Sequence, residues 1–360
     1  MERFFAPENK SALDALYDAQ KIAFAPIVFQ ATRALRDLGI LQVLQGSGDR
    51  GLTVEAIAEQ LELREYGVRV LVESGLSAGV LAVAEERFTV TKTGYLILTD
   101  PMTRANMDYN HFLCYQGLYF MDEAIRSGEP SGLKVFGEWD TIYPGLTALP
   151  SVARDSWFNF NHYYSDRAFL DALPRVFAEP PVSLLDIGGN TGRWAIACAR
   201  HSSDVSVTIV DLPEQLEVAR QAIAEAALEQ RISCLELDLL EPGVVLPGGH
   251  DVIWMSQFLD CFGPEDIFRL LELTARSMDE HTRLYILEPL WDRQRHEMAA
   301  YCLINTSLYF TCMANGKSRM YRSEDIRGFI ERAGLTVTQE WDELGICHTL
   351  LECRMSSDTS

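Results

Sequence analysis

The second half of the chain alternates between short apolar runs and longer amphipathic stretches. The apolar runs are rich in branched residues, as is typical of strands buried on both faces. Helical patterns separate the first six runs, as crossovers between parallel strands require, whereas the last two runs are joined so tightly that they predict an antiparallel hairpin. The seven predicted strands cover residues 182–187, 205–210, 232–237, 251–255, 283–287, 335–343 and 347–353.

The first part of the chain predicts a mostly helical domain instead. Apolar residues at helical spacing cover residues 1–23 and 27–38, Thr53 is placed to cap a further helix, and another helix spans residues 64–77. A short alternating segment follows at 80–91 and suggests a β-wing. Helices followed by such a wing are typical of a winged-helix domain.

These patterns divide the chain into three predicted parts. A winged-helix domain covers residues 1–105, and an aromatic, helical linker covers 106–180. Residues 181–355 predict an α/β domain with a Rossmann-like, doubly wound sheet of seven strands, the last of them antiparallel. The aromatic side chains of the linker fit either the core between two domains or the wall of an apolar ligand pocket.

A glycine turn marks the candidate ligand site of the predicted sheet. The first strand ends in Asp186, and the chain then passes through Gly188, Gly189 and Gly192 into a helical pattern. Glycine permits positive φ and close approach to the backbone, and the following helix offers unpaired N–H groups. The spacing differs from the dinucleotide fingerprint G-x-G-x-x-G. The turn therefore has the form of a nucleotide-type site without that fingerprint.

Two more predicted strands also end in an acidic residue. Asp211 lies about twenty residues beyond the turn, where a carboxylate can accept both ribose hydroxyls. Asp238 ends the third strand. A single strand-end aspartate is usually a helix cap or a turn former. Three of them in register with a glycine turn favour a ligand site at the carboxyl edge of the sheet.

Charge argues against a polyanionic partner. The formal net charge is −21 at pH 7, whereas nucleic-acid binders concentrate Lys and Arg on one face. The helix that would read DNA, REYGVRVLVESG, carries two Glu beside two Arg and offers little surface for phosphates. We therefore expect no nucleic-acid partner.

The remaining composition indicates a protein of the cytoplasm. The eight cysteines are dispersed and form no C-x-x-C motif, so we expect neither disulfides nor a structural metal. No apolar run approaches the length of a membrane span, and the start MERFFAPENK lacks the pattern of a signal peptide. We expect a cytoplasmic protein without membrane contact.

At its motifs the chain resembles the class I S-adenosylmethionine-dependent O-methyltransferases. The ordered motifs are LLDIGGNTG, VDLPEQLEVA, LELDLLEP, DVIWMSQFLDCF and LYILEPL. The resemblance is strongest to two-domain small-molecule enzymes, typified by plant caffeic acid and bacterial hydroxyneurosporene methyltransferases, and it runs over nearly the whole chain. It implies S-adenosylmethionine as cofactor, a small aromatic acceptor, and a homodimer formed through the N-terminal domain.

The same resemblance implies which residues bind the cofactor. Asp211 would take the ribose, Asp238 the adenine amino group, and Phe262 would stack on the adenine. The glycine turn would hold the methionine moiety, with Asp186 orienting the turn or the cofactor's amino group. The cofactor-binding residues that we predict are Asp186, Gly188, Gly189, Gly192, Asp211, Leu212, Asp238, Leu239, Ser256, Gln257 and Phe262.

The catalytic residues depart from the family pattern. The family has a histidine base and two glutamates that orient it. Here the base position matches Asp260, and the first glutamate matches Glu288. The second glutamate falls in the family's GKE pattern, which reads GKS at residues 316–318. A family lysine near the cofactor is matched by Ser256.

A carboxylate is a poor base for an ordinary phenol, because their pKa values are about 4 and about 10. Three explanations stay open. Burial beside Glu288 can raise the pKa of Asp260. The acceptor can itself be acidic, as an enol, a carboxylic acid or a carbonyl-conjugated phenol is. Finally His162, in the segment WFNFNHYY whose FN matches a pocket-lining segment of the family, can act as the base or be a hydrogen-bonded interdomain histidine.

Other histidines and two other functions complete the alternatives. We expect core or surface roles for His111 and His348, and Glu288 can equally be a strand-end residue that binds a backbone amide. Some relatives, such as the anthracycline 10-hydroxylase, keep the fold without the base and catalyse hydroxylation. A ligand-sensing regulator that binds DNA through the winged helix is the second rival, which the charge disfavours.

Overall fold

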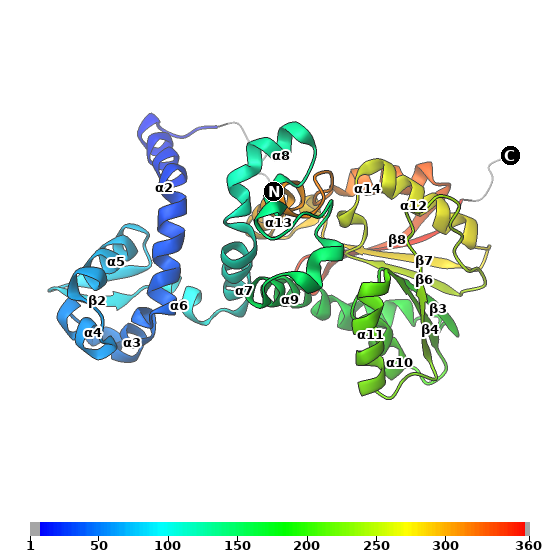
Figure 1. The fold of residues 1–360 in the computed structure, drawn as a ribbon, viewed down its shortest axis with the longest axis horizontal. Helices are drawn as coiled ribbons and strands as arrows, with labels where there is room; N and C mark the ends of the chain where they lie inside the picture. The colour runs from blue at the N-terminus through cyan, green and yellow to red at the C-terminus, as the bar shows by residue number, and fades with distance from the viewer. Residues whose placement is uncertain (1–7, 357–360) are drawn as a thin grey trace. The chain divides into compact units, whose positions relative to one another are not determined.

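The computed structural model describes residues 8–356, which form two compact units that divide after Asn110 (Figure 1). The N-terminal unit contains helices α2 (Ala12–Asp37), α3 (Ile40–Ser47), α4 (Val54–Leu61), α5 (Glu65–Ser77), α6 (Lys92–Thr99) and α7 (Pro101–Tyr109). Strands β1 (Leu81–Ala84) and β2 (Arg87–Val90) pair antiparallel as the wing. The predicted winged-helix fold is confirmed, and Thr53 caps α4 by accepting a hydrogen bond from Ala56 N at 3.3 Å.

The prediction of two separate helices at residues 1–23 and 27–38 is wrong. They form one helix, α2, with Pro26 inside it, and the first seven residues of the prediction lie outside the described part of the chain. The two predicted ranges leave out residues 24–26, and the Pro26 in this gap lacks the backbone N–H that a helix interior uses. The helix continues because its second half is fixed by packing, with Leu35 fully buried among the core residues of α3 and α5.

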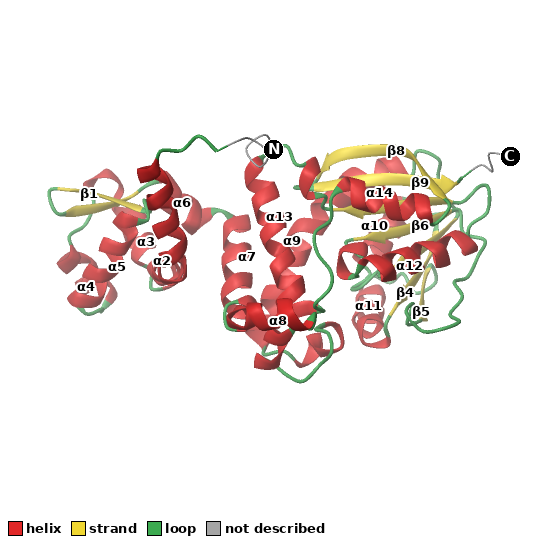
Figure 2. Cartoon of the chain, turned by 90° about the horizontal axis from the view of Figure 1, so that it is seen from above, coloured by secondary structure: helices red, strands yellow, loops and turns green. Residues whose placement is uncertain are grey.

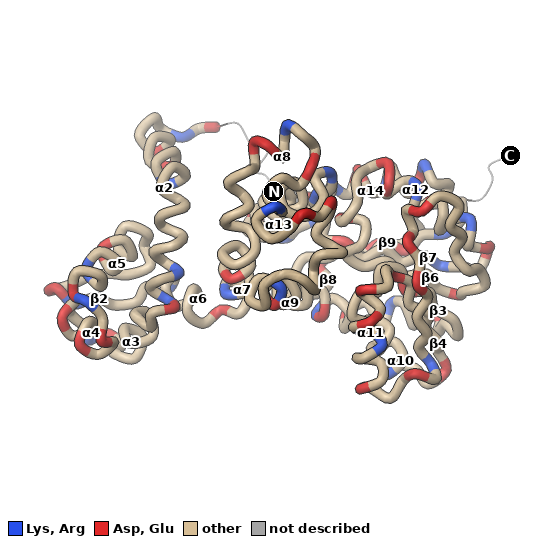
Figure 3. The backbone as a smooth tube through the Cα atoms, in the orientation of Figure 1, with Lys and Arg blue, Asp and Glu red and all other residues tan. Residues whose placement is uncertain are grey.

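Basic and acidic residues are interleaved along the backbone of this unit (Figure 3). Arg69 of α5, the helix that would read DNA, pairs with Glu55 of α4 at 3.2 Å. Arg36 is buried and pairs with both Asp37 and Asp108. These arginines are therefore engaged within the unit rather than gathered on one face.

The C-terminal unit is built on one seven-stranded sheet of order β5-β4-β3-β6-β7-β9-β8 (Figure 2). The first five strands in this order are parallel to one another. Strand β9 is antiparallel to both β7 and β8, and its pairing with β8 is the hairpin predicted from the sequence. The strands are β3 (Ser183–Ile187), β4 (Ser206–Asp211), β5 (Ile232–Glu236), β6 (Val252–Ser256), β7 (Arg283–Glu288), β8 (Leu335–Leu344) and β9 (His348–Met355).

Helices cover both faces of this sheet, which confirms the doubly wound fold. One buried core packs Trp254 and Leu184 against residues of α9 (Ser151–Val176), α10 (Arg193–His201) and α11 (Pro213–Glu225). The other packs Ile253 and Leu185 against α12 (Pro264–Ser277) and α14 (Ser323–Arg332). Neighbouring strand residues alternate between these cores, so the strands are apolar on both faces.

Residues 111–150 form short helical segments that precede the long helix α9 in the chain. They include α8 (Met121–Ser127), a π-helical turn (Asn110–Cys114) and three 3-10 turns (Gly117–Phe120, Ser131–Val135, Tyr143–Ala148). Helix α13 (Glu297–Tyr309) continues into a second π-helical turn (Phe310–Ala314), and three more 3-10 turns lie at Leu259–Cys261, Trp291–Arg293 and Gly48–Arg50. No helix of residues 8–356 is both long and apolar enough to cross a membrane.

Candidate active site

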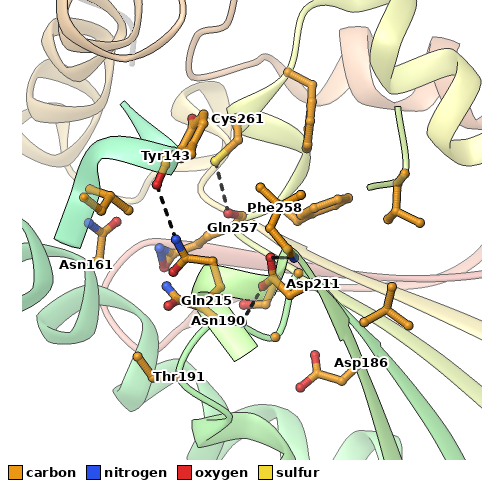
Figure 4. Close-up of a pocket in the computed structure, with 18 of the residues that line it drawn as sticks. Tyr143, Asn161, Asp186, Asn190, Thr191, Asp211, Gln215, Gln257, Phe258 and Cys261 are labelled. Carbon is orange, nitrogen blue, oxygen red and sulfur yellow. Dashed lines mark hydrogen bonds between the residues drawn. The ribbon is translucent and has the colours of Figure 1, made fainter. Parts of the chain in front are cut away.

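A cavity of about 640 Å³ opens at the carboxyl edge of the sheet (Figure 4). Its walls come from the ends of β3, β4, β5 and β6, from α9, and from the segments around Tyr143 and Asn315. This volume lies within the range of small-molecule sites, about 300–1,000 Å³. The place agrees with the rule that open α/β sheets bind ligands beyond the carboxyl ends of their strands.

The glycine turn after β3 forms the floor of the cavity. Gly188 has φ +70°, and a Cβ there would stand 2.2 Å from the Phe258 ring. A Cβ on Gly189 would stand 2.8 Å from Asp186 Oδ2. The turn therefore needs glycine for both conformation and space. Gly192, predicted with the others, is not among the lining residues, and its φ of +74° starts α10 close to Ile209.

Asp211 joins the glycine turn to the next strand. One of its carboxylate oxygens accepts from Asn190 N and the other from Leu212 N, both at 2.8 Å. Burial raises the pKa of Asp211, and these two hydrogen bonds oppose the rise. Carboxylate oxygens have further lone pairs, so a ligand hydroxyl can still bind here.

Asp186 lies beneath the turn and has an unsatisfied oxygen. The side chain is 2% exposed, and no described group bonds its Oδ2. Burial and the negative charge of Asp211 raise the pKa of Asp186 to about 8. In the free chain this carboxyl group is therefore largely protonated at neutral pH, and a cationic ligand would favour its ionised form.

Unpaired polar atoms and acidic groups in the cavity indicate the polarity and charge of its ligand. Five of the nine buried polar side-chain atoms without a partner in the described chain line this cavity, on Asp186, Asn190, Trp194, Trp254 and Ser256. The cavity also has more acidic than basic lining residues, six against two. The acids are Asp166, Asp186, Asp211, Glu214, Asp238 and Asp266, and the bases are Arg193 and Lys317. Such a lining fits a polar ligand of positive charge better than a phosphate ester.

The part of the cavity near β5 and the loop after β6 has aromatic and acidic side chains suited to binding a nucleobase. Phe262 meets Phe258 edge to face with ring centroids 4.8 Å apart, and both line the cavity. Asp238 lies nearby on the loop after β5, where its carboxylate accepts from Leu240 N at 2.9 Å. Four other residues predicted to bind the cofactor also line the cavity, namely Leu212, Leu239, Ser256 and Gln257.

Asp260 and Glu288, the two matched catalytic residues, lie behind the cavity wall. Both are buried, and neither is among the lining residues. Glu288 Oε1 accepts from the backbone N–H groups of Phe258 at 3.0 Å and Leu259 at 2.8 Å. Glu288 therefore holds the turn that carries Asp260. Burial raises the pKa of Asp260 to about 7, and burial with the nearby Asp260 raises that of Glu288.

The neighbouring residue, Cys261, lines the cavity instead of Asp260. Asn315 fixes this wall, because its Nδ2 donates to Cys261 O at 2.7 Å and to Tyr143 Oη at 3.4 Å. The Sγ–H of Cys261 donates to Asp260 at 3.4 Å. Sequence reasoning missed Asn315 and Tyr143, although Asn315 directly precedes the GKS segment where a family glutamate was sought.

His162 lines the cavity from α9. Its ring stacks on Phe158 with centroids 5.9 Å apart, and its Nδ1 lies 3.8 Å from Asp166 Oδ1. Burial and the positive charge of Arg193 lower the pKa of His162 to about 4, against the opposing effect of Asp166. A histidine of such low basicity is neutral at pH 7 and accepts a proton weakly.

His348 has a contact that sequence reasoning missed. It is 1% exposed and its Nε2 donates to Gln257 Oε1 at 2.7 Å. Burial lowers its pKa to about 4, so the ring is neutral at pH 7. Gln257 lines the cavity and has a left-handed φ of 47°.

His111 packs on Phe112 with ring centroids 4.7 Å apart and does not line the cavity. The described residues contain no cluster of three acidic, His or Cys residues suited to a metal.

Two family models match the chain in separate regions. Residues 17–88 match a dimerisation2-like domain, and residues 170–336 match an O-methyltransferase domain. The L-tyrosine C(3)-methyltransferase of Streptomyces lavendulae is 24% identical over 336 residues, covering 91% of this chain and 88% of the relative. Aclacinomycin 10-hydroxylase RdmB of Streptomyces purpurascens is 24% identical over 267 residues, or 72% and 68% of the two chains.

A solved structure extends this similarity to the fold. The S-adenosylmethionine-dependent methyltransferase SibL, in its apo form, matches with a TM-score of 0.73 and 25% identity. The match covers 95% of this chain and 100% of SibL.

Proposed function

Because the chain belongs to the two-domain, class I S-adenosylmethionine-dependent O-methyltransferases, we propose that it methylates an acidic hydroxyl of a small aromatic or conjugated metabolite. S-adenosylmethionine is the cofactor of this family. When bound, it supplies a methyl group on a positively charged sulfur for attack by a nucleophilic oxygen.

The cavity lining supports contacts to each part of the cofactor. Asp211 would bind the ribose hydroxyls, and Asp238 with Phe262 would bind the adenine. The glycine turn and Asp186 would receive the methionine moiety. The excess of acidic groups suits the net positive charge of the cofactor.

One observation carries the choice of an acidic acceptor. Neither candidate base is suited to removing a proton from an ordinary phenol. Asp260 has a suitable pKa of about 7 but lies behind the wall formed by Cys261, whereas His162 lines the cavity but has a pKa of about 4. General-base catalysis is most effective when the pKa of the base lies near the working pH. An acceptor that loses its proton to water near neutral pH needs no such base.

The chain's own residues then act mainly by alignment. Trp157, Tyr143 and Leu146 give the acceptor end an aromatic and apolar lining. The indole Nε1 of Trp157 donates to Tyr309 Oη at 2.8 Å, which fixes its ring. A fixed wall holds the acceptor oxygen in line with the methyl group and excludes water that would compete for it.

The direct test is binding followed by turnover. Isothermal titration with S-adenosylmethionine and S-adenosylhomocysteine should give micromolar affinity. Mass spectrometry with a panel of phenols of graded acidity should then find products heavier by one methylene, with the fastest transfer to the most acidic members. Faster transfer to unactivated phenols would refute the acidic-acceptor proposal.

Ring-carbon methylation is the nearest competing outcome. A phenolate is nucleophilic at its ortho carbon as well as at oxygen, and the relative aligned over 91% of this chain is named a tyrosine C(3)-methyltransferase. NMR of the product distinguishes the two, because O-methylation removes the phenolic hydroxyl whereas C-methylation removes a ring proton.

Hydroxylation is the second candidate, favoured by Asp260 in place of the family histidine and by the similarity to a hydroxylase. It predicts cofactor binding together with oxygen-dependent product formation. Product that forms only under air and contains one added oxygen would replace the methyl-transfer proposal.

The N-terminal unit supports a homodimer. Helix α2 has exposed apolar side chains between residues 13 and 27, and part of this helix falls within the matched dimerisation domain. These side chains are Leu13, Leu16, Tyr17, Ile22, Phe24 and Ile27. An exposed stripe of this size is expected to be covered by a second protein surface. Light scattering should give twice the mass of the 40.5 kDa chain.

A further inference from the structure

Two basic side chains line the cavity, and they lie in different surroundings. Lys317 pairs with Asp266 of α12 at 3.2 Å and packs beside Gly263, one residue after Phe262. Arg193 is the first residue of α10 and directly follows the glycine turn. Arg193 is therefore the basic residue at the glycine-turn end of the cavity.

An ion pair links Arg193 of α10 to Asp166 of α9. Its Nη1 donates to Asp166 Oδ2, and the same carboxylate lies 3.8 Å from His162 Nδ1. The Arg193 side chain is half exposed, and both Asp166 and His162 line the cavity with it. A guanidinium group has five N–H donors in a fixed plane, so the one bond to Asp166 leaves others for a ligand.

Buried, unpartnered polar groups lie at the same end. Asp186 and Trp194 line the cavity and are each 2% exposed, and no described group bonds Asp186 Oδ2 or Trp194 Nε1. This end therefore combines a cation, a buried carboxyl group and a buried N–H donor. Such a set is complementary to a group that has both an ammonium and a carboxylate.

We infer that Arg193, oriented by Asp166, binds the carboxylate of the cofactor's amino-acid moiety. The inference rests on the proposed cofactor contacts, in which the adenosine lies toward Asp238 and the amino-acid end toward the glycine turn. The guanidinium then bridges Asp166 and the ligand carboxylate. Asp166 is a positioning residue in this arrangement, because it acts on the ligand through Arg193.

The bridge also couples the cofactor site to His162. The charged groups that face His162 are Arg193 from α10 and Asp166 from its own helix, with Phe158 stacked on the ring. The charge of Arg193 lowers the pKa of His162. A bound carboxylate offsets that charge, so the pKa of His162 is higher with a ligand that has the carboxylate than with a ligand that lacks it.

Calorimetry with two ligands tests the assignment. S-adenosylhomocysteine and its decarboxylated analogue differ only in the carboxylate. Arg193→Met should weaken binding of S-adenosylhomocysteine by roughly tenfold or more and leave the affinity for the analogue unchanged within about twofold. Arg167→Met is the matched control, because Arg167 is an exposed arginine of α9 whose guanidinium lies over the Tyr163 ring at 5.0 Å. It should change neither affinity.

Other results would overturn the inference. Equal losses for both ligands would mean that Arg193 supports the fold of the site, and no loss for either would mean that the carboxylate binds elsewhere. If Arg193→Met leaves S-adenosylhomocysteine unaffected but weakens binding of salicylate, the arginine serves an acceptor carboxylate instead. If the unaltered protein binds no S-adenosylhomocysteine, the proposed function itself fails. Arg193→Lys keeps the charge without the fork, and should recover only part of the affinity.

Proton NMR of the His162 ring tests the coupling separately. The pKa of His162 should be higher with S-adenosylhomocysteine bound than with the decarboxylated analogue bound. The same value with both ligands would refute the link through Arg193.

Discussion

The two ends of the cavity are built in different ways. The cofactor end consists of strand ends and a glycine turn. Gly188 N donates to Val210 O, and the Asp211 carboxylate accepts from the backbone N–H groups of Asn190 and Leu212. The acceptor end consists of side chains from segments far apart in sequence, joined by Asn315. Backbone geometry tolerates little substitution, whereas a side-chain wall can change with the ligand. The first end should therefore fix the cofactor, and the second should set the acceptor.

Gly188→Ala should have the largest effect, at the cofactor end. The added Cβ would meet the Phe258 ring at 2.2 Å at a positive φ, so we expect cofactor affinity to fall by at least about a hundredfold. Gly243→Ala is the matched control, because Gly243 has φ +82° but no heavy atom within 4 Å of the added Cβ. Titration calorimetry of both variants, with circular dichroism to check folding, measures the difference. Wild-type affinity in Gly188→Ala would show that the turn does not approach the ligand.

Cofactor affinity should depend on pH through Asp186. Its folded pKa is about 8, raised by burial and by Asp211, so the carboxyl group is protonated below that pH. A cationic ligand favours the ionised form, and binding therefore releases a proton. Affinity should rise with pH, by up to about tenfold per unit, and level off above pH 8.

Calorimetry in buffers of different ionisation enthalpy measures the proton release. Asp186→Asn removes the titrating group and should flatten the profile, leaving only the contribution of Asp211. An unchanged slope in that variant would assign the titration to another residue.

Much of this cofactor end was predictable from the sequence because it depends on local order. A strand, a turn and a helix that follow one another place Asp186, Gly188 and Gly189 together whatever the rest of the chain does. The hairpin of β8 and β9 and the cap at Thr53 were predictable for the same reason. The continuity of α2 through Pro26 was not, because packing on other helices decides it.

The acceptor end depends on contacts that no local pattern reveals. Asn315 bonds Cys261 across 54 positions, and His348 bonds Gln257 across 91. Motif matching named Asp260, yet the neighbouring Cys261 lines the cavity. A turn of one 3-10 helix decides which of the two side chains faces the ligand, and the packing of Glu288 beneath the turn sets its orientation.

At the acceptor end, removing either candidate base should have a moderate effect. A general base typically increases the rate by about 10²-fold to 10⁴-fold. Because the acceptor's own acidity replaces a base, Asp260→Asn and His162→Ala should each lower the turnover number by less than about tenfold with an acidic phenol. Steady-state kinetics with the identified acceptor measures this. Abolished turnover in one variant alone would identify that residue as the base and remove the argument for an acidic acceptor.

The smallest expected effect sharpens the boundary between the two ends. His348 Nε2–H occupies the carbonyl end of the Gln257 amide, which leaves the NH₂ end to face a ligand. If Gln257 contacts the acceptor, and not the cofactor for which the sequence predicts it, His348→Asn should lower kcat/KM for the acceptor about threefold to fivefold and leave cofactor affinity unchanged, since a net hydrogen bond contributes about 1 kcal/mol. His250→Asn is the matched control, because His250 bonds Ser183 Oγ at 2.7 Å just before β6, at the opposite edge of the sheet. Combining His348→Asn with Gln257→Ala should cost no more than Gln257→Ala alone, as expected if the histidine acts only through the amide. A loss of cofactor affinity in His348→Asn would instead assign Gln257 to the cofactor end, as the sequence predicts, and the boundary between the two ends of the cavity would then lie beyond Gln257 on the loop after β6.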